Sequence, residues 1–217
     1  MSNQEPIFIE VSAFNNDSVV SDTVVQLVKD LKIECIIETG TFCGTTTAFL
    51  SDTFPDLEIY TIEVDEANYL KARANLSDYK NIKILFGSSE KVLELLLPLL
   101  KERRTLFYLD AHWEDYWPIL DEMRAISKNL KDNCCIVIDD FKVPFRPFQH
   151  DTYGDQPLDV DYIQEKMNEV YTTPFYFFND RSTRESRAVG KIYIVPNEWR
   201  DRVLIPLTEE NGFFYVM

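Results

Sequence analysis

Acidic side chains follow most of the apolar runs in this sequence, and these are the first residues that could do chemistry. Glu38 ends the run IECIIE, Glu63 ends LEIYTIE, and Asp110 ends TLFYLD. Asp139 and Asp140 come together after CCIVI. Carboxylates can hold a cationic ligand, bind a divalent metal ion or transfer protons. Which of these applies depends on whether the positions meet in the folded chain.

A turn with two glycines follows Glu38 in the stretch ETGTFCGTTT. Gly40 and Gly44 permit a tight turn and let a ligand approach the backbone closely. A dinucleotide-binding turn has the spacing G-x-G-x-x-G, which places pyrophosphate on a helix N-terminus. Here the two glycines are separated differently, and Glu38 would repel pyrophosphate. The turn therefore favours a cationic ligand or one with an ammonium group, with an ordinary strand-to-helix turn as the alternative.

Glu63 stands at the end of the next apolar run, where it can accept hydrogen bonds from a ribose diol. The same placement occurs in NAD enzymes. Glu63 alone therefore does not choose between a nicotinamide cofactor and another nucleoside-containing cofactor.

Three aspartates can converge into a metal site. Asp110 and the pair Asp139–Asp140 end two runs that we expect to be neighbouring strands, roughly 5 Å apart. Carboxylates so crowded repel one another unless a cation or protons neutralise them. A hard divalent ion with oxygen ligands, Mg²⁺ for preference, fits this set. In the alternative interpretation no metal binds, Asp110 only touches the cofactor, and Asp140 caps a loop.

His112 is the first candidate for a general base. It lies two residues beyond Asp110, and an imidazole titrates near neutral pH, as removal of a hydroxyl proton requires. It could equally be a metal neighbour or a surface histidine. His150, in a proline-rich stretch, is the weaker candidate.

Alternating strand and helix patterns position these residues. Apolar runs predict strands at 33–38, 57–63, 82–86, 105–110 and 134–139. Helical spacing predicts helices at 18–31, 45–54, 66–77, 89–101 and 116–130. This alternation indicates βαβ units and a parallel sheet, covered on both faces by helices because its strands are almost wholly apolar. Ligands bind at the carboxyl ends of such strands, where the acidic residues stand.

The pattern changes after residue 140. Residues 141–158 have no periodicity, and a loop of that length in a compact domain is usually functional. A short helix is predicted at 159–170, and strands at 173–180 and 190–196 form an antiparallel hairpin that closes the sheet. We expect one domain over 1–217: an N-terminal helical segment (1–32), a cofactor-binding core (33–140), and an acceptor loop with the closing hairpin (141–217).

Composition limits the partners. The chain has 217 residues, of which 45% are hydrophobic, as in folded globular proteins. Its net charge of −15 disfavours nucleic acid and anionic membranes as partners. The four cysteines lack CxxC spacing and predict reduced, buried thiols. Without a signal peptide or an apolar run that could span a bilayer, the expected location is cytoplasmic. A homo-oligomer stays open.

Three stretches, ETGTFCGTTT, IYTIEVD and FGSSEKVL, together resemble the class I S-adenosylmethionine-dependent methyltransferases. The first turn is most similar to the O-methyltransferase branch with E-T-G-T-x-x-G-T/S, in which a residue such as Phe42 replaces the central glycine of the commoner G-x-G form. The resemblance covers residues 33 to about 141. It implies an α/β fold, a Rossmann-like three-layer sandwich with a seven-stranded, mostly parallel sheet and an antiparallel C-terminal hairpin.

The resemblance also implies roles for residues. Those expected at the cofactor's amino-acid half are Glu38, Gly40, Thr41, Phe42 and Gly44, followed by Thr45 and Thr46. Glu63 is expected at the ribose, and Ser88 and Ser89 beside the adenine. The sequence is further similar to metal-dependent methyltransferases of antibiotic sugars and small-molecule hydroxyls. That similarity makes Asp110, Asp139 and Asp140 the candidate metal ligands, with Asp110 also next to the cofactor and Asp110 and His112 as catalytic candidates.

The expected function is S-adenosylmethionine-dependent O-methylation of a hydroxyl on a small molecule or sugar, assisted by a divalent ion such as Mg²⁺. Two other classes stay open. One is a NAD-type Rossmann oxidoreductase, and the other is a binding or scaffolding protein with a methyltransferase fold and no turnover.

Overall fold

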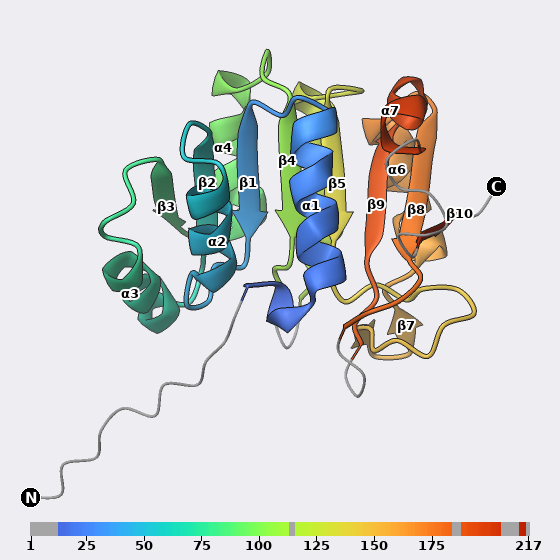
Figure 1. Ribbon diagram of the computed structural model, residues 1–217, viewed down its shortest axis with the longest axis horizontal. Coiled ribbons are helices and arrows are strands. Elements are labelled where there is room, and N and C mark those ends of the chain that lie inside the picture. Colours follow the sequence, from blue (N-terminus) through green and yellow to red (C-terminus); the bar gives the residue numbers. More distant parts are fainter. Residues whose placement is uncertain (1–12, 113–115, 184–187, 205–212, 216–217) are drawn as a thin grey trace, which may run out of the picture.

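The computed structural model describes residues 13–112, 116–183, 188–204 and 213–215. An eight-stranded sheet in the order β10-β8-β9-β5-β4-β1-β2-β3 runs through this part of the chain (Figure 1). The strands of this sheet are β1 (Cys35–Thr39), β2 (Glu58–Glu63), β3 (Ile82–Phe86), β4 (Thr105–Leu109), β5 (Cys134–Ile138), β8 (Pro174–Asn179), β9 (Ile192–Pro196) and β10 (Phe213–Tyr215). A separate two-stranded sheet pairs β6 (Thr152–Tyr153) with β7 (Gln156–Pro157).

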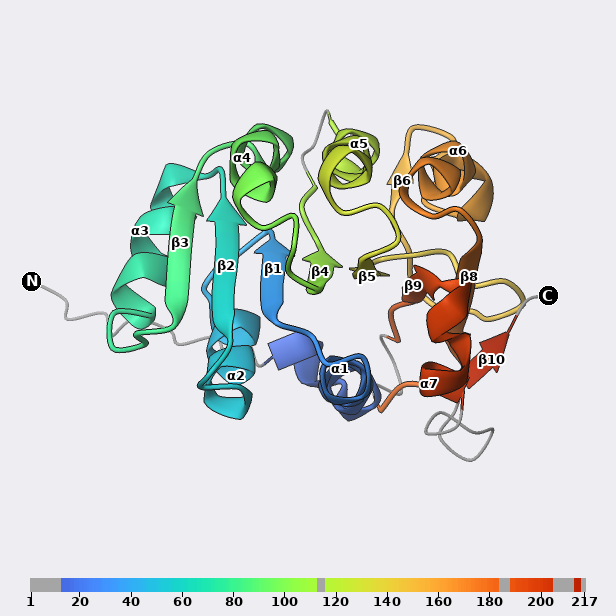
Figure 2. The ribbon, with the colours of Figure 1, turned by 90° about the horizontal axis from the view of Figure 1, so that it is seen from above.

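Helices cover both faces of the large sheet (Figure 2). On one face lie α1 (Ser18–Asp30), α2 (Thr45–Thr53) and α7 (Arg200–Leu204), and on the other lie α4 (Ser89–Leu96), α5 (Ile119–Asn129) and α6 (Val160–Val170). The remaining helix α3 (Glu66–Asn75) lies beside β3 at the edge. Short 3₁₀ turns are η1 (Ala13–Asn16), η2 (Leu97–Leu99) and η3 (Asn197–Trp199). The predicted Rossmann-like three-layer α/β sandwich is confirmed.

The first five strands are parallel, as their apolar character predicted. β1 pairs with β2 and β4, β2 with β3, and β4 with β5. Every residue of β1, β4 and β5 is buried. Their side chains alternate between two hydrophobic cores, one under each helical layer, since successive strand residues point to opposite faces. Ile37 belongs to the core under α4, α5 and α6, and its neighbour Ile36 to the core under α1 and α2.

The closing hairpin is also confirmed. β9 runs antiparallel to β5, and β8 runs antiparallel to β9. These two strands complete the predicted seven. β10 then pairs antiparallel with β8 and extends the sheet by one short strand.

Prolines set two element boundaries that the sequence pattern placed differently. The helix predicted at 89–101 ends as α4 at Leu96 and continues as η2, with Pro98 in its first positions. The helix predicted from residue 116 begins as α5 at Ile119, directly after Pro118. Proline lacks the N–H that a helix interior needs but fits a helix start, which explains both differences.

The loop at 141–158 has more internal structure than its lack of periodicity indicated. It contains the β6–β7 hairpin and is tied back to the sheet. The N–H of Asp151 donates to the carbonyl of Asp140 (2.8 Å), and that of Lys142 donates to the carbonyl of Leu158 (2.8 Å). Both ends of the hairpin are thus fixed against the chain that leaves β5. Among the described residues, no helix has the length and apolar character needed to cross a bilayer.

Candidate functional site

A cavity of about 410 Å³ opens at the carboxyl ends of the parallel strands. Gly40 and Phe42 line it from the turn after β1, and Glu63 from the end of β2. The ends of β4 and β5 contribute Asp110, His112 and Asp140. Residues that the sequence analysis took from four separate strand ends therefore share one cavity.

Both glycines of the first turn are required by its geometry. Gly40 has φ +87°, and a Cβ on it would lie 2.5 Å from the carbonyl oxygen of Asp110. Gly44 has φ +81° at the start of α2, and a Cβ there would lie 2.7 Å from the side chain of Leu76. Side chains other than hydrogen would therefore clash as well as strain the backbone. Gly40 is also the point where the turn after β1 touches the end of β4.

Glu38 lies beneath this turn rather than in the cavity wall. Its buried carboxylate accepts hydrogen bonds from the hydroxyls of Thr47 and Thr61, the latter at 2.7 Å. Burial raises the pKa of Glu38 to about 7, although the two hydroxyls act to lower it. Thr41 is also turned inward, with its hydroxyl 2.6 Å from that of Thr61. These contacts hold the turn from below, and a direct contact of Glu38 with a ligand stays a prediction.

Four more residues expected at the cofactor stand at the starts of α2 and α4, and only one of them lines the cavity. Thr45 and Thr46 begin α2 outside the cavity lining, and Thr46 accepts a hydrogen bond from the N–H of Phe14 (3.2 Å). Ser88 is the N-cap residue of α4, and its hydroxyl donates to Glu90 instead of capping the helix. Ser89 lines the cavity.

Glu63 faces the cavity with its carboxylate already fixed by the backbone. It accepts hydrogen bonds from the N–H groups of Phe42 (2.8 Å), Val64 (2.9 Å) and Asp65 (2.9 Å). The first bond joins β2 to the turn after β1, in which Phe42 has φ +48°. The Phe42 ring is half-exposed, with the Lys71 ammonium 5.7 Å from its centroid. A carboxylate oxygen can accept more than one hydrogen bond, so Glu63 keeps capacity for a ligand.

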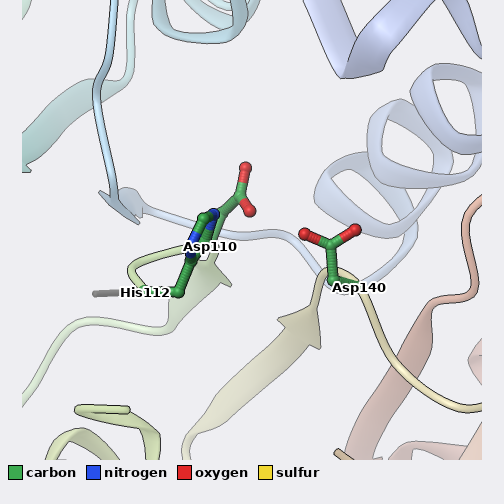
Figure 3. A group of neighbouring side chains, drawn as sticks. All are labelled: Asp110, His112 and Asp140. Atoms are coloured by element: carbon green, nitrogen blue, oxygen red, sulfur yellow. The ribbon is translucent and has the colours of Figure 1, made fainter. Parts of the chain in front are cut away.

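Asp110, His112 and Asp140 form a cluster at the other side of the cavity (Figure 3). Each offers one ligand atom, and these atoms lie within 4.8 Å of one another. Asp110 follows β4 and Asp140 follows β5, so the pairing of these two strands brings them together. Within the described residues, neither carboxylate accepts a hydrogen bond. Asp140 also has φ +50°, an uncommon backbone conformation for a residue with a side chain.

The electrostatics of this cluster favour a cation. Burial, followed by the charge of Asp139, raises the pKa of Asp110 well above its usual range. Burial and Asp139 likewise raise the pKa of Asp140. Two partly buried carboxylates without hydrogen-bond donors are stabilised as ions by a positive charge that joins them. Two oxygens and one imidazole nitrogen around a common point are suitable ligands for a divalent ion.

Asp139, the third predicted metal ligand, is not part of this cluster. Its buried carboxylate forms an ion pair with Lys191 and accepts hydrogen bonds from the Tyr108 hydroxyl (2.5 Å) and the Asp140 N–H (2.6 Å). Both aspartates follow the end of β5, and Asp140, with φ +50°, is the one that lines the large cavity. The structure therefore brings His112 to Asp110 and Asp140, in place of Asp139.

Residues 37–141 match a family model described as a methyltransferase domain. Over this stretch the chain is similar to methyltransferase domains. A search of curated protein sequences gave no match to the chain.

Solved structures agree with this domain at the level of the fold. A proposed caffeoyl-CoA O-methyltransferase from Staphylococcus aureus is 17% identical with a TM-score of 0.59, covering 82% of this chain and 84% of its own. The O-methyltransferase TomG from Streptomyces achromogenes, in complex with SAM, is 16% identical with a TM-score of 0.59 and coverages of 82% and 80%. The SAH-bound methyltransferase PaMTH1 from Podospora anserina is 18% identical with a TM-score of 0.52 and coverages of 79% and 75%.

Asn15 is one of the cavity residues that the sequence analysis did not predict. Asn15 lines the cavity from η1, where Phe14, Asn15 and Asn16 all have positive φ (50°, 56° and 64°). The Phe14 ring anchors the turn edge-on against Tyr108, with centroids 5.2 Å apart. Asparagine adopts this conformation more readily than most residues, so the adjacent Asn15–Asn16 pair was the available signal. Residues 1–12 of the predicted N-terminal segment lie outside the described residues.

The second base candidate, His150, does not line the cavity. His150 is exposed in the 141–158 loop, with its Nδ1 3.3 Å from the carbonyl oxygen of Phe148. His112 is the histidine that lines the cavity.

Proposed function

We propose that the chain is an S-adenosylmethionine-dependent O-methyltransferase that acts on a hydroxyl of a small molecule or sugar, with a divalent ion assisting. One observation carries the proposal. A single cavity joins the Gly40 turn and Glu63 to Asp110, His112 and Asp140. Methyl transfer needs this arrangement, since cofactor and acceptor must meet with the reacting atoms at near-attack distance.

We assign the cofactor to the side of the cavity formed by β1 and β2. Glu63 accepts hydrogen bonds from the ribose diol, Ser89 lies beside the adenine, and the Gly40 turn receives the amino-acid end. TomG is in complex with SAM and PaMTH1 is SAH-bound, which supports the same cofactor here. The positive sulfonium would lie near the acidic end of the cavity, where a pyrophosphate would be repelled.

We assign the divalent ion to Asp110 and Asp140. A bound ion lowers the pKa of a hydroxyl that coordinates it. Hard ions such as Mg²⁺ often bind through one or two carboxylates and the substrate, so two aspartates are enough. Oxygen ligands alone would favour Mg²⁺ or Mn²⁺, whereas participation of the His112 nitrogen would favour a transition metal ion.

We assign His112 as the general base. Its ring nitrogen lies within the same 4.8 Å group as the two carboxylates, and its side chain is the exposed member of the three. A hydroxyl held between Asp110 and Asp140 would therefore be within reach of the imidazole. His112→Gln should lower the turnover strongly while divalent-ion affinity changes by less than about threefold. A tenfold loss of ion affinity would make His112 a ligand instead.

The buried cysteines support a reducing, cytoplasmic location. All four, Cys35, Cys43, Cys134 and Cys135, are free and buried, which is the usual state in proteins of the cytosol.

Calorimetry with SAM, SAH and NADH tests the cofactor assignment. We expect SAM and SAH to bind once per chain and NADH to compete with neither. Transfer of labelled methyl groups to fractionated small molecules and sugars then tests turnover. Binding of NADH instead of SAM would contradict the proposal, and SAM binding without transfer to any acceptor would favour a binding protein. Activity that survives both chelation and Asp140→Asn would remove the metal from the proposal and leave the rest.

A further inference from the structure

A buried ion pair lies next to the acidic cluster and has no role in the reaction as described. Lys191 is 2% exposed and Asp139 is 3% exposed. Lys191 directly precedes β9, the strand that pairs antiparallel with β5, so its side chain comes from outside the segment that supplies the cavity. Lysine is almost never fully buried unless it is paired, and the pair costs free energy of desolvation. Its position beside a candidate metal site calls for an explanation.

The contacts of Asp139 leave it no freedom to turn toward the cavity. One carboxylate oxygen accepts the hydrogen bond from Tyr108, and the other meets the Lys191 ammonium and the Asp140 N–H. Both oxygens are thus engaged by donors from β4, from the residue before β9 and from the next residue in the chain. A metal ion could recruit Asp139 only by displacing the Lys191 ammonium.

The backbone around Lys191 is held as firmly as its side chain. Its N–H donates to the side-chain carbonyl of Asn179 (2.7 Å). The neighbouring Gly190 accepts a hydrogen bond from the N–H of Phe141 (2.9 Å), and a Cβ on Gly190 would lie only 2.0 Å from the Phe141 carbonyl oxygen. Lys191 is therefore fixed relative to the chain that immediately follows Asp140.

The charge of Lys191 also reaches the cluster itself. It acts to lower the pKa of both Asp110 and Asp140, against the stronger effects of burial and of Asp139. The single positive charge of Lys191 offsets the negative charge of Asp139, with which it forms the ion pair. The three aspartates alone would place three negative charges around a divalent ion. With Lys191 present, the ion has one negative charge fewer to balance.

We propose that Lys191 is an internal counter-ion that keeps Asp139 out of the metal site and so fixes the number of carboxylate ligands at two. The inference rests on the proposed metal site at Asp110 and Asp140. Lys191 is a positioning residue here, because it acts on the ion only through Asp139. Without this ammonium, Asp139 loses its counter-charge and keeps only the hydrogen bonds from Tyr108 and the Asp140 N–H, one residue away from a metal ligand. More carboxylates bind hard divalent ions more tightly, so ion affinity should then rise.

A double-mutant cycle on purified full-length chain tests the proposal. The variants are Lys191→Met, Asp139→Asn, and both changes together, and the readouts are Mg²⁺ and Mn²⁺ affinity by calorimetry and Mn²⁺ electron paramagnetic resonance. Lys191→Met should bind Mg²⁺ at least about tenfold more tightly than wild type. The double variant, with a neutral pair at these positions, should stay within about threefold of wild type.

Two results would overturn the proposal. If the folded Lys191→Met variant binds Mg²⁺ no more tightly than wild type, Lys191 does not withhold a ligand. If the double variant loses more than tenfold in ion affinity, Asp139 is itself a ligand. The double variant decides the matter alone if Lys191→Met does not fold, because it leaves no buried charge unpaired.

The failure of this proposal is distinguishable from failure of the proposed function. If wild type binds SAH but no divalent ion, metal assistance is wrong while the cofactor assignment stands. The Lys191→Met arm then decides the inference, since a Mg²⁺ site that exists only in that variant supports it and the lack of one overturns it.

Discussion

The two sides of the cavity hold their carboxylates in opposite ways. On the side of β1 and β2, Glu38 is bound by two threonine hydroxyls and Glu63 by three backbone N–H groups. On the side of β4 and β5, Asp110 and Asp140 accept no hydrogen bond from any described residue, and the charge of Asp139 adds to burial in raising their pKa values. The first pair is complete without a ligand, whereas the second lacks a positive charge.

The contrast is sharpest between two adjacent residues. Asp139 is saturated by Lys191, Tyr108 and a backbone N–H, while Asp140 is left without a donor. A carboxylate satisfied by the protein shapes the site, and one left unsatisfied awaits a ligand. On this basis the cofactor side is preformed and the acceptor side is completed by what binds there. Four variants can break or sharpen this comparison.

Gly40→Ala should have the largest effect, because Gly40 is where the two sides touch. The added methyl would meet the Asp110 carbonyl at 2.5 Å, and the backbone would be strained at φ +87°. We expect loss of measurable SAM binding and a fall in the free energy of unfolding of roughly 2–4 kcal/mol. Calorimetry and denaturant titration measure both. Gly154→Ala is the control, since Gly154 has φ +60° but nothing within 4 Å. Equal losses in the two variants would refute the close-contact argument.

Asp140→Asn should have the next largest effect and should spare the cofactor. Replacing one of two charged ligands by a neutral amide should weaken Mn²⁺ binding roughly a hundredfold, with SAH affinity nearly unchanged. Electron paramagnetic resonance of Mn²⁺ measures the first and calorimetry the second. Asp155→Asn removes the same charge from an exposed turn and serves as the control. If both variants weaken Mn²⁺ equally, the ion responds to net charge and not to a site.

Glu63→Gln should weaken the cofactor and spare the ion. The amide NH₂ of glutamine is a donor, so it would face at least one of the backbone N–H groups that now donate hydrogen bonds to Glu63. Charge-assisted hydrogen bonds of this kind contribute about 1.5–3 kcal/mol, so SAH affinity should fall roughly ten- to hundredfold. Asp65→Asn is the matched control, since Asp65 caps α3 and does not line the cavity. Unchanged SAH affinity in Glu63→Gln would move the cofactor away from β2.

Glu122→Gln should change stability and leave ligand binding within about twofold of wild type. Glu122 is fully buried on α5, and burial, against nearby Ser89 and Thr39 hydroxyls, raises its pKa from 4.5 to about 7. The folded chain therefore holds this proton more tightly than the unfolded chain. Stability should fall as pH rises from about 4.5 to about 7 and then level off. At pH 8 the variant should be more stable by up to about 3 kcal/mol.

Urea titrations of both proteins between pH 4.5 and 8 check this sign. Part of the slope should survive in Glu122→Gln, because burial also raises the pKa of Glu38 to about 7. A variant that is less stable than wild type at pH 8 would contradict the account.

The sequence predicted the parallel sheet well because its signals are local. Continuous apolar runs and helical spacing placed the strands and helices within a few residues, as at Ile82–Phe86 and Thr45–Thr53. Errors arose where a proline moved a helix end, at Pro98 and Pro118, and where a loop folded on itself at 141–158. β10 depends on pairing with a strand far away in the sequence, which a local pattern does not reveal.

The site was harder to predict, because the hydrogen-bond donors and counter-ions of a carboxylate come from residues distant in sequence. The acidic residues at strand ends were found, but their division into satisfied and unsatisfied groups was not. Strand alternation does not separate Asp139 from Asp140, since both follow the end of β5 and Asp140 has φ +50°. Nothing local to Asp139 pointed to Lys191, whose only signal was a lysine at the start of an apolar run. Asn15 reaches the cavity through a backbone turn with positive φ, which the spacing of apolar residues does not predict.

The central claim is that one cavity brings the cofactor's methyl group to the acidic cluster. Nuclear magnetic relaxation of SAM carrying a ¹³C-labelled methyl group, bound to the protein with and without Mn²⁺, tests it directly. The account predicts strong paramagnetic relaxation of the methyl signal in wild type and its loss in Asp140→Asn, with SAM still bound. A methyl signal that Mn²⁺ leaves unchanged in wild type, with both ligands shown to be bound, would contradict it.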